Sequence, residues 1–272
     1  MSATRLEPRR VEKVWGRRDL GPPFGDVPGD CEPVGEIWFE APEPGDARLL
    51  VKYLFTSERL SIQVHPDDLA ARAGGERCGK DEAWLVLSAE PGATIGLGLK
   101  DEVSAEALRA AALDGSIDAL MDWRPVRSGD VFYSPAGTIH AIGAGLRLIE
   151  VQQNVDLTYR LYDYGRPREL HLDQAVAVAR PEPFRGEQRP VPLGPGRTLV
   201  CAGDKLRIER FCGAGRFDLE DAAWIIPLSG SARIEGQELE PGEVWMSRNA
   251  SLDLAEGAEV LAAFACADSA GK

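Results

Sequence analysis

Short stretches of alternating or β-branched residues, separated by glycine and proline, recur along most of this chain. Among them are "LLVKYLF", "LSIQVH", "EAWLVLS" and "GLRLIEVQQ". The 29 glycines and 19 prolines are scattered between these stretches, which indicates short strands and frequent turns. Many short strands at turn-marked spacing are typical of a β-sandwich or barrel. We therefore predict an all-β fold with a few short helices.

Two segments interrupt the β pattern with helical character. Residues 104–122 begin at Ser104, a suitable N-cap, and Gly115 divides them into two short helices. A second short helix is expected in "LDQAVAVA", capped by Asp173. Residues 181–197 are rich in proline and charge and are interpreted as a linker. It would join a domain of residues 1–180 to a second β-barrel domain, residues 198–272.

Charge and composition exclude several classes of partner. A net charge of −13 argues against nucleic acid, because binding to the phosphate backbone needs a basic surface. The longest apolar run, "VLAAFACA", is far shorter than the roughly 18 residues of a membrane span, so no membrane association is expected. The five cysteines include no C-x-x-C pair, which favours neither disulfides nor a cysteine zinc site. We expect a cytoplasmic protein and leave its oligomeric state open.

Three histidines are present, and two of them lie in strand-like segments. His65 ends "LSIQVH", with Gln63 two residues earlier on the same strand face, and His140 lies in "GTIHAIGAG". Glu82 begins another predicted strand. A single strand histidine is more often structural than a ligand. Two imidazoles and a carboxylate together suit zinc, manganese or ferrous iron, and the Gln63 amide oxygen could be a fourth ligand.

Four segments carry a resemblance to a known family. In this order and spacing, "LSIQVHPDD", "GKDEAW", "PAGTIHAIGAG" and "EVQQNVDLTYRLYDYGR" resemble the type I phosphomannose isomerases, metal-dependent members of the cupin superfamily. The similarity runs from about residue 11 to residue 179. It implies a bicupin and the zinc-dependent, reversible isomerisation of mannose 6-phosphate and fructose 6-phosphate through a cis-enediol. The expected partner is thus a small-molecule sugar phosphate.

The resemblance also implies a ligand set and a catalytic group. One zinc ion per chain would be held by Gln63, His65, Glu82 and His140. Since all three histidines precede residue 181, we expect no metal site in the C-terminal domain. The catalytic residues implied are Arg160, the pocket lysine Lys80, and the acidic residues Glu150 and Asp156 that line the same cavity.

Some roles stay open at the level of sequence. Glu150 is our first choice for the base, and Asp156 is equally well placed by spacing; either could instead orient Arg160 through a salt bridge. The substrate-binding residues are expected to be Ser61, Lys80, Arg160 and Arg166, with the cations available for phosphate. The apolar Leu60, Ile62 and Val64 would pack outside the barrel.

One departure from the family and several alternatives bear on function. Longer members carry a histidine directly before the pocket lysine, where this chain has Gly79, so a mechanism that uses that histidine cannot operate here. The same scaffold could isomerise another sugar or sugar phosphate. An iron-dependent cupin oxygenase fits less well, because the amide ligand has no place in it. A non-catalytic sugar-phosphate-binding protein would have no need of a complete ligand set.

Overall fold

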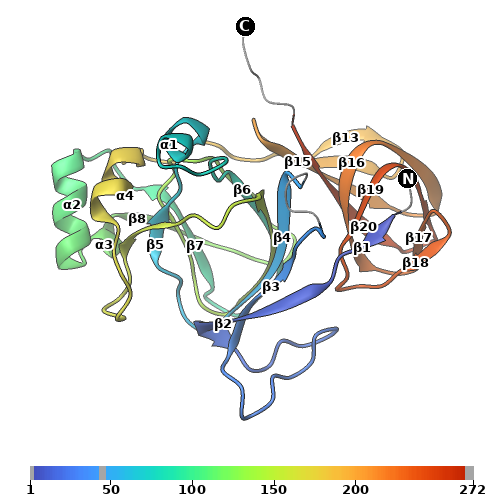
Figure 1. The fold of residues 1–272 in the computed structure, drawn as a ribbon, viewed down its shortest axis with the longest axis horizontal. Helices are drawn as coiled ribbons and strands as arrows, with labels where there is room; N and C mark the ends of the chain where they lie inside the picture. The colour runs from blue at the N-terminus through green and yellow to red at the C-terminus, as the bar shows by residue number, and fades with distance from the viewer. Residues whose placement is uncertain (1–2, 43–46, 267–272) are drawn as a thin grey trace, which may run out of the picture.

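The strands of this protein form three sheets, and a few short helices lie outside them (Figure 1). The computed structural model describes residues 3–42 and 47–266. Paired strands within the sheets run antiparallel, and strand residues greatly outnumber helical ones. The prediction of a mainly β fold with few helices is confirmed. Within the described residues, no helix has the length and apolar character needed to cross a membrane.

The first sheet has six strands in the order β2-β3-β4-β11-β6-β9. Its strands are β2 (Pro8–Arg17), β3 (Val34–Phe39), β4 (Leu49–Thr56), β6 (Glu82–Ala89), β9 (Val131–Ser134) and β11 (Leu146–Gln153). Every residue of β3 and β4 is buried. Both faces of this sheet are therefore covered, which explains the continuous apolar runs in these strands.

The second sheet has five strands in the order β12-β5-β10-β7-β8. They are β5 (Ile62–Val64), β7 (Thr94–Leu99), β8 (Met121–Pro125), β10 (His140–Ile142) and β12 (Tyr159–Tyr162). Its inner face shares one hydrophobic cluster with the six-stranded sheet, to which Leu97 and Trp84 both belong. The two sheets thus enclose a common interior.

The opposite face of the five-stranded sheet packs against helices. These are α2 (Ala105–Asp114), α3 (Ile117–Leu120) and α4 (Leu172–Val178), which lie at the left of Figure 1. Ile62 and Val64 belong to the cluster on this side, as predicted. Leu60 packs instead in the interior cluster, because it precedes β5 and does not follow the alternation of that strand.

The helix ends follow from local hydrogen bonding. Ser104 caps α2, since its hydroxyl accepts the Ala107 N–H at 3.2 Å, and Gly115 ends the helix at φ 84°. The predicted helical insertion at residues 104–122 is confirmed. Asp173 is not the cap of α4: His171 holds that position and Asp173 lies within the first turn. A further helix, α1 (Asp68–Ala73), was not predicted.

The third sheet contains the C-terminal strands and one strand from the beginning of the chain. The C-terminal strands are β13 (Val191–Gly194), β14 (Arg197–Ala202), β15 (Leu206–Cys212), β16 (Gly215–Ser229), β17 (Ala232–Ile234), β18 (Gln237–Leu239), β19 (Trp245–Leu254) and β20 (Glu259–Ala265). Strand β1 (Thr4–Arg5) pairs with β19. The segment 181–197, expected to be a linker, therefore includes a short strand.

The third sheet covers the outer face of the six-stranded sheet. Val51 and Ile149 of the six-stranded sheet share a hydrophobic cluster with Val200, Ile208 and Leu261 of the third. Figure 1 shows the strands β13 to β20 grouped at one end of the molecule and the helices α2 to α4 at the other. The interior between the first two sheets lies between these ends.

Candidate functional site

One cross-strand row on the five-stranded sheet carries three of the expected site residues. Arg160 of β12 lies opposite Gln63 of β5, and Gln63 lies opposite His140 of β10. Residues directly opposite each other in antiparallel strands present their side chains on the same face. The register therefore brings together three polar side chains that are distant in the sequence.

Glu82 joins this row from the facing sheet. It is the first residue of β6, and its Oε1 lies 2.9 Å from His140 Nε2 and 3.4 Å from His65 Nε2. One ligand atom from each of these residues lies within 4.8 Å of the others, and all three residues are buried. His65 directly follows β5. The two sheets thus place two imidazoles and a carboxylate at a single point.

The hydrogen bonding of the group fits a metal ion. His140 Nδ1 lies 2.9 Å from the carbonyl oxygen of Thr138, which can only accept, so Nδ1 carries the proton and Nε2 offers its lone pair. Both carboxylate oxygens of Glu82 are buried without a hydrogen-bond partner among the described residues. Oε2 has the ammonium of Lys80 beside it at 3.0 Å, whereas Oε1 faces the two imidazole nitrogens, and a metal ion at that point would bind all three atoms. His65, Glu82 and His140 could therefore bind a metal.

Gln63 lies beside the same point. Its Nε2 is 3.2 Å from His140 Nε2, and its Oε1 is 3.3 Å from the hydroxyl of Ser61. Rotation of the amide by half a turn exchanges its nitrogen and oxygen, and the Ser61 hydroxyl can donate to one and accept from the other. Ser61 itself is buried. An amide oxygen is thus available next to the imidazoles.

Burial and Lys80 together influence the charge state of the group. Its Nζ lies 3.0 Å from Glu82 Oε2 and 3.3 Å from His65 Nε2. Burial, followed by the charge of Lys80, lowers the pKa of His65 to about 3. Burial alone would raise the pKa of Glu82, but Lys80 and the two imidazoles hold it well below its usual value. A neutral imidazole and an ionised carboxylate are the forms that ligate a metal.

Glu150 has partners that sequence reasoning missed. Its Oε1 lies 3.2 Å from Lys52 Nζ, and its Oε2 accepts a hydrogen bond from Trp84 Nε1 at 3.1 Å. Lys52 Nζ also lies 4.4 Å from the ring centre of Trp38. The four residues Trp84, Glu150, Lys52 and Trp38 form one row across the six-stranded sheet. The signal in the sequence was the single charge within "LLVKYLF".

The guanidinium of Arg160 is half-buried and incompletely paired. Its Nε is buried without a hydrogen-bond partner among the described residues. Its backbone N–H donates to His171 Nδ1 at 3.2 Å, and its carbonyl accepts from the His171 N–H at 2.9 Å. Burial, then the charge of Arg168, lowers the pKa of Arg160, and Asp163 and Asp156 act against this. A free guanidinium N–H in this position suits an anionic ligand.

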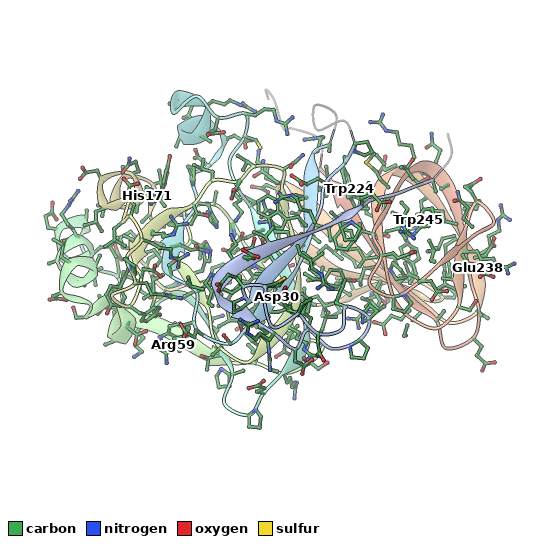
Figure 2. The ribbon with its side chains drawn as sticks, turned by 60° about the horizontal axis from the view of Figure 1, so that its bottom comes forward. Asp30, Arg59, His171, Trp224, Glu238 and Trp245 are labelled. Carbon is green, nitrogen blue, oxygen red and sulfur yellow. The ribbon has the colours of Figure 1, made fainter. Side chains whose placement is uncertain are left out.

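Asp156 and Arg166 lie outside the buried group. Asp156 follows β11 and is exposed. Arg166 forms an ion pair with Asp163 at 3.0 Å and donates to the carbonyl oxygen of Arg59 at 2.6 Å. Figure 2 shows Arg59 and His171 in the half of the molecule away from Trp224 and Trp245. Arg166 therefore serves first to tie the segment after β12 to the chain before β5.

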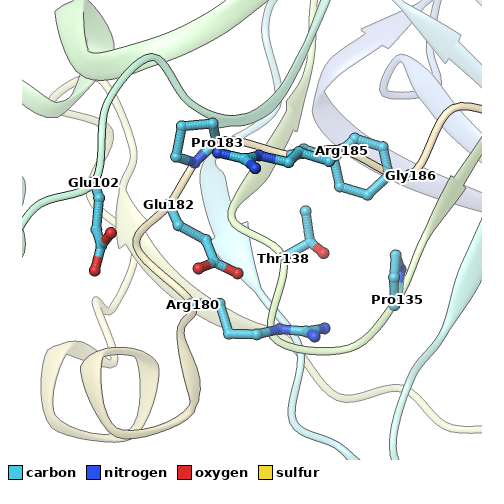
Figure 3. A pocket seen from close by; sticks show the side chains of 9 residues that line it. Glu102, Pro135, Thr138, Arg180, Glu182, Pro183, Arg185 and Gly186 are labelled. Atoms are coloured by element: carbon cyan, nitrogen blue, oxygen red, sulfur yellow. The ribbon is translucent and has the colours of Figure 1, made fainter.

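A hollow of about 440 Å³ lies beside Thr138, outside the metal group. Figure 3 shows Arg180, Glu182 and Thr138 around it, and Glu102, Pro135 and Arg185 nearby. Arg180 donates to the carbonyl oxygen of Ala136, which anchors the chain after α4 to the loop before β10. This hollow borders the loop that holds His140, and none of the four expected ligands lines it.

Gly79 lies where two backbone segments touch. A Cβ added to Gly79 would lie 2.4 Å from the carbonyl carbon of Asp67 and 2.6 Å from the carbonyl oxygen of Pro66. The following residue, Lys80, donates its N–H to the same Pro66 carbonyl at 3.0 Å. Only a glycine allows this approach without a shift of the backbone.

The chain is similar to several known proteins, although no protein-family model matches it. It is 35% identical over 212 residues to mannose-6-phosphate isomerase of Streptococcus mutans, which covers 64% of this chain and 66% of that protein. It is 42% identical over 138 residues to mannose-6-phosphate isomerase ManA of Bacillus subtilis, covering 48% and 43%. A putative mannose-6-phosphate isomerase of B. subtilis, YvyI, is 35% identical over 64% of this chain and 67% of its own length.

Solved structures give the same result. The crystal structure of mannose 6-phosphate isomerase from B. subtilis has a TM-score of 0.84 and 25% identity, covering 97% of this chain and 100% of that chain. Phosphomannose isomerase from Salmonella typhimurium has the same fold, with a TM-score of 0.79 at 15% identity over 98% of this chain. The sequence alignments span about two thirds of the S. mutans protein and less than half of ManA. The chain belongs to the family of type I mannose-6-phosphate isomerases.

Proposed function

We propose that this protein interconverts mannose 6-phosphate and fructose 6-phosphate. The observation that carries the proposal is the meeting of His65, Glu82 and His140 beside Lys80, in a chain whose relatives are named for this reaction. The substrate is a small sugar phosphate, for which Lys80 and Arg160 supply positive charge. Zinc is the metal that we propose, with Gln63 as its fourth ligand.

The reaction moves a proton between C1 and C2 of the open sugar through a cis-enediol. Zinc at this site would supply Lewis acidity for the negative charge that develops on the sugar oxygens. Arg160 would hold the phosphate or the enediolate through its guanidinium. We propose Glu150 as the base because it is buried between Trp84 and Lys52, whereas Asp156 is exposed.

The proposal includes the organisation of the chain as two cupin barrels. The first would comprise residues 1–180 and contain the metal group, and the second would comprise residues 198–272. The match to the whole B. subtilis chain supports this arrangement. Since residues 181–272 contain no histidine, we propose one metal per chain.

A single experiment tests the activity. The purified protein is stripped of metal with a chelator, supplied with zinc, and followed by proton NMR with mannose 6-phosphate, with unphosphorylated mannose in parallel. We expect fructose 6-phosphate from the zinc-loaded protein and none from the stripped protein or from Glu82→Gln. Turnover that survives complete removal of metal would contradict the proposal. Turnover of unphosphorylated mannose without turnover of mannose 6-phosphate would indicate an isomerase of a different sugar substrate.

A further inference from the structure

The chain between two of the expected ligands folds back on itself. It leaves the site after His65 and returns at Lys80 and Glu82, and in between it forms α1. Asp68, the first residue of α1, joins the two ends of the segment 66–79, which we call the excursion: its Oδ1 accepts the Gly79 N–H at 2.8 Å. The same oxygen accepts Gln153 Nε2 at 2.9 Å. Asp68 therefore ties both arms of the excursion to the end of β11.

The C-terminal sheet contacts this excursion through one turn. The turn joins β14 to β15 and contains Lys205, whose Nζ lies 2.7 Å from Asp68 Oδ2. The side chains of this pair are 24% and 16% exposed, so the ion pair is shielded more than a surface pair and is worth correspondingly more. Lys205 thus contacts the carboxylate oxygen that Gly79 and Gln153 leave free, and Arg72 lies farther from the same oxygen, at 3.9 Å.

A second contact leads from the same turn to the residue next to Glu82. The Tyr133 hydroxyl accepts the Lys205 N–H at 3.4 Å and donates to Asp81 Oδ2 at 2.5 Å. Asp81 Oδ1 accepts the Ala136 N–H at 3.0 Å. The turn packs closely on the ring, since a Cβ at Gly203 would lie 1.9 Å from Tyr133 Cζ. The turn is therefore linked to the segment that contains His65 and Glu82 at two points, through Asp68 and through Tyr133 and Asp81.

From this geometry we propose that Lys205, in the C-terminal sheet, is a positioning residue for the metal site. Through Asp68 it fixes the excursion between His65 and Glu82, and so sets the distance between these two ligands and the place of Lys80. The contact between Lys205 and Asp68 lies at the edge of the apolar interface between the sheets, on the segment that connects His65 to Glu82. It gives the C-terminal sheet a role in the site although it contributes no ligand. In its activity readout the inference rests on the proposed function.

The test compares Lys205→Met, Lys205→Arg and a control in an exposed ion pair of the same sheet, Arg233→Met. Arg233 of β17 also forms an ion pair in the third sheet, with Glu238 of β18 at 2.6 Å, and this pair lies away from the turn. Zinc affinity is measured by competition with a chromophoric chelator, and kcat and KM are measured per bound zinc.

We expect Lys205→Met to weaken zinc binding by about five- to tenfold, below the loss typical of groups that touch a ligand directly. The kcat of Lys205→Met per bound zinc should fall several-fold with little change in KM. Lys205→Arg should recover most of the lost zinc affinity and most of the lost kcat. Arg233→Met should change neither zinc affinity nor kcat. Asp68→Asn combined with Lys205→Met should lose no more than the larger single loss, because both remove one contact.

A purely structural role predicts another result. Lys205→Met would then lower the unfolding temperature while zinc affinity and kcat per bound zinc stay at the parental values, and this outcome overturns the inference. If the parent protein shows no isomerase activity, the proposed function fails, but the zinc affinities of the same variants still decide whether Lys205 positions the metal site.

Discussion

Several charged side chains are buried between the first two sheets. Lys52, Lys80, Glu82 and Glu150 are all at most 5% exposed. Lysine and glutamate are almost never this buried unless they are paired, and unusual placement of this kind is common at functional sites. At the scale of the residue, the charged groups that we propose as catalytic or metal-binding are therefore also groups whose burial requires an ion-pair partner.

Arg160 is the residue whose replacement best separates charge from shape. Arg160→Ala should lower kcat/KM by about 10²- to 10⁴-fold, the range for loss of one positioned electrostatic group. Arg160→Lys should recover only a small part, because lysine keeps the charge but cannot form two parallel hydrogen bonds. Steady-state kinetics and zinc analysis check both variants. Zinc content should stay at the parental value; an active, zinc-loaded Arg160→Ala would show that this arginine is not catalytic.

Lys52 offers a prediction about stability. Lys52→Met removes one partner of a buried ion pair and should lower the free energy of unfolding by about 3 kcal/mol or more, since Glu150 is left without its counter-charge. Adding Glu150→Gln should restore part of this loss, because the amide still accepts from Trp84 and no longer carries a charge. Urea unfolding measures both. Equal stability of the parent and Lys52→Met would mean that the ion pair between Lys52 and Glu150 does not form in solution.

The sequence predicted which residues meet at the candidate metal site better than it predicted their surroundings. His65, Glu82 and His140 could be predicted because histidine is scarce and the motifs around it are specific, and the structure brings them to one point. The partners of Glu150 could not, because its pairing with Lys52 and Trp84 depends on the register of the three strands β4, β11 and β6. Register is a non-local property that alternation within one strand does not contain.

Strands β5, β10 and β12 are short, and each contributes one side chain to the site. The alternation of β5 could be read in "LSIQVH", and Ile62 and Val64 do face the helices. The order β12-β5-β10 was not readable, because it requires strands from three separate parts of the chain to pair. Helix α1 was missed because it has only six residues and its cap, Asp67, lies in a segment that reads as a turn.

Helix α2 tests whether the outer layer affects the site. Ser104→Ala removes the hydroxyl that accepts the Ala107 N–H, and should lower the free energy of unfolding by about 1 kcal/mol. Ser104→Asp, which keeps an acceptor, should be close to the parent. Isomerase activity should not change in either variant, because α2 packs on the outer face of the five-stranded sheet. Urea unfolding and kinetics on the same samples check this, and a loss of activity in Ser104→Ala would contradict it.

At the scale of the molecule, three sheets share two interfaces. The six-stranded sheet lies between the other two, which is why β3 and β4 are buried on both faces. Composition and repeated turns were enough to predict a β fold with further strands after residue 198, although the third sheet already begins with β13 inside the predicted linker. They could not predict that this sheet also takes in Thr4 and Arg5, since two residues carry no readable pattern.

The ion pair between Asp68 of α1 and Lys205 of the turn between β14 and β15 predicts a pH dependence. Burial acts to raise the pKa of Asp68, but hydrogen bonds from Lys205 and Gln153 lower it to about 2, from 3.8. A lowered carboxyl pKa stabilises the fold above the unfolded value, and this contribution is lost as pH falls from about 4 towards 2. Asp68→Asn should therefore be less stable than the parent at neutral pH, by about 1 kcal/mol because partial exposure screens the charges.

The stability difference between parent and Asp68→Asn should shrink as the pH falls below about 4. Urea unfolding of both proteins at several pH values measures it, with Arg233→Met, which leaves Asp68 intact, as the control. A difference that stays constant down to the lowest pH at which both remain folded would show that the ionisation of Asp68 is not coupled to folding.

The pairing of β1 with β19 has a consequence for the order of events during synthesis. Thr4 lies opposite Met246, so the first described strand leaves the ribosome long before its partner exists. The ligand-bearing strands can pair while the C-terminal sheet is still being made, but β1 must wait, unpaired, for β19. We therefore expect β1 to be among the last of the described strands to take its final place, only after β19 has been made.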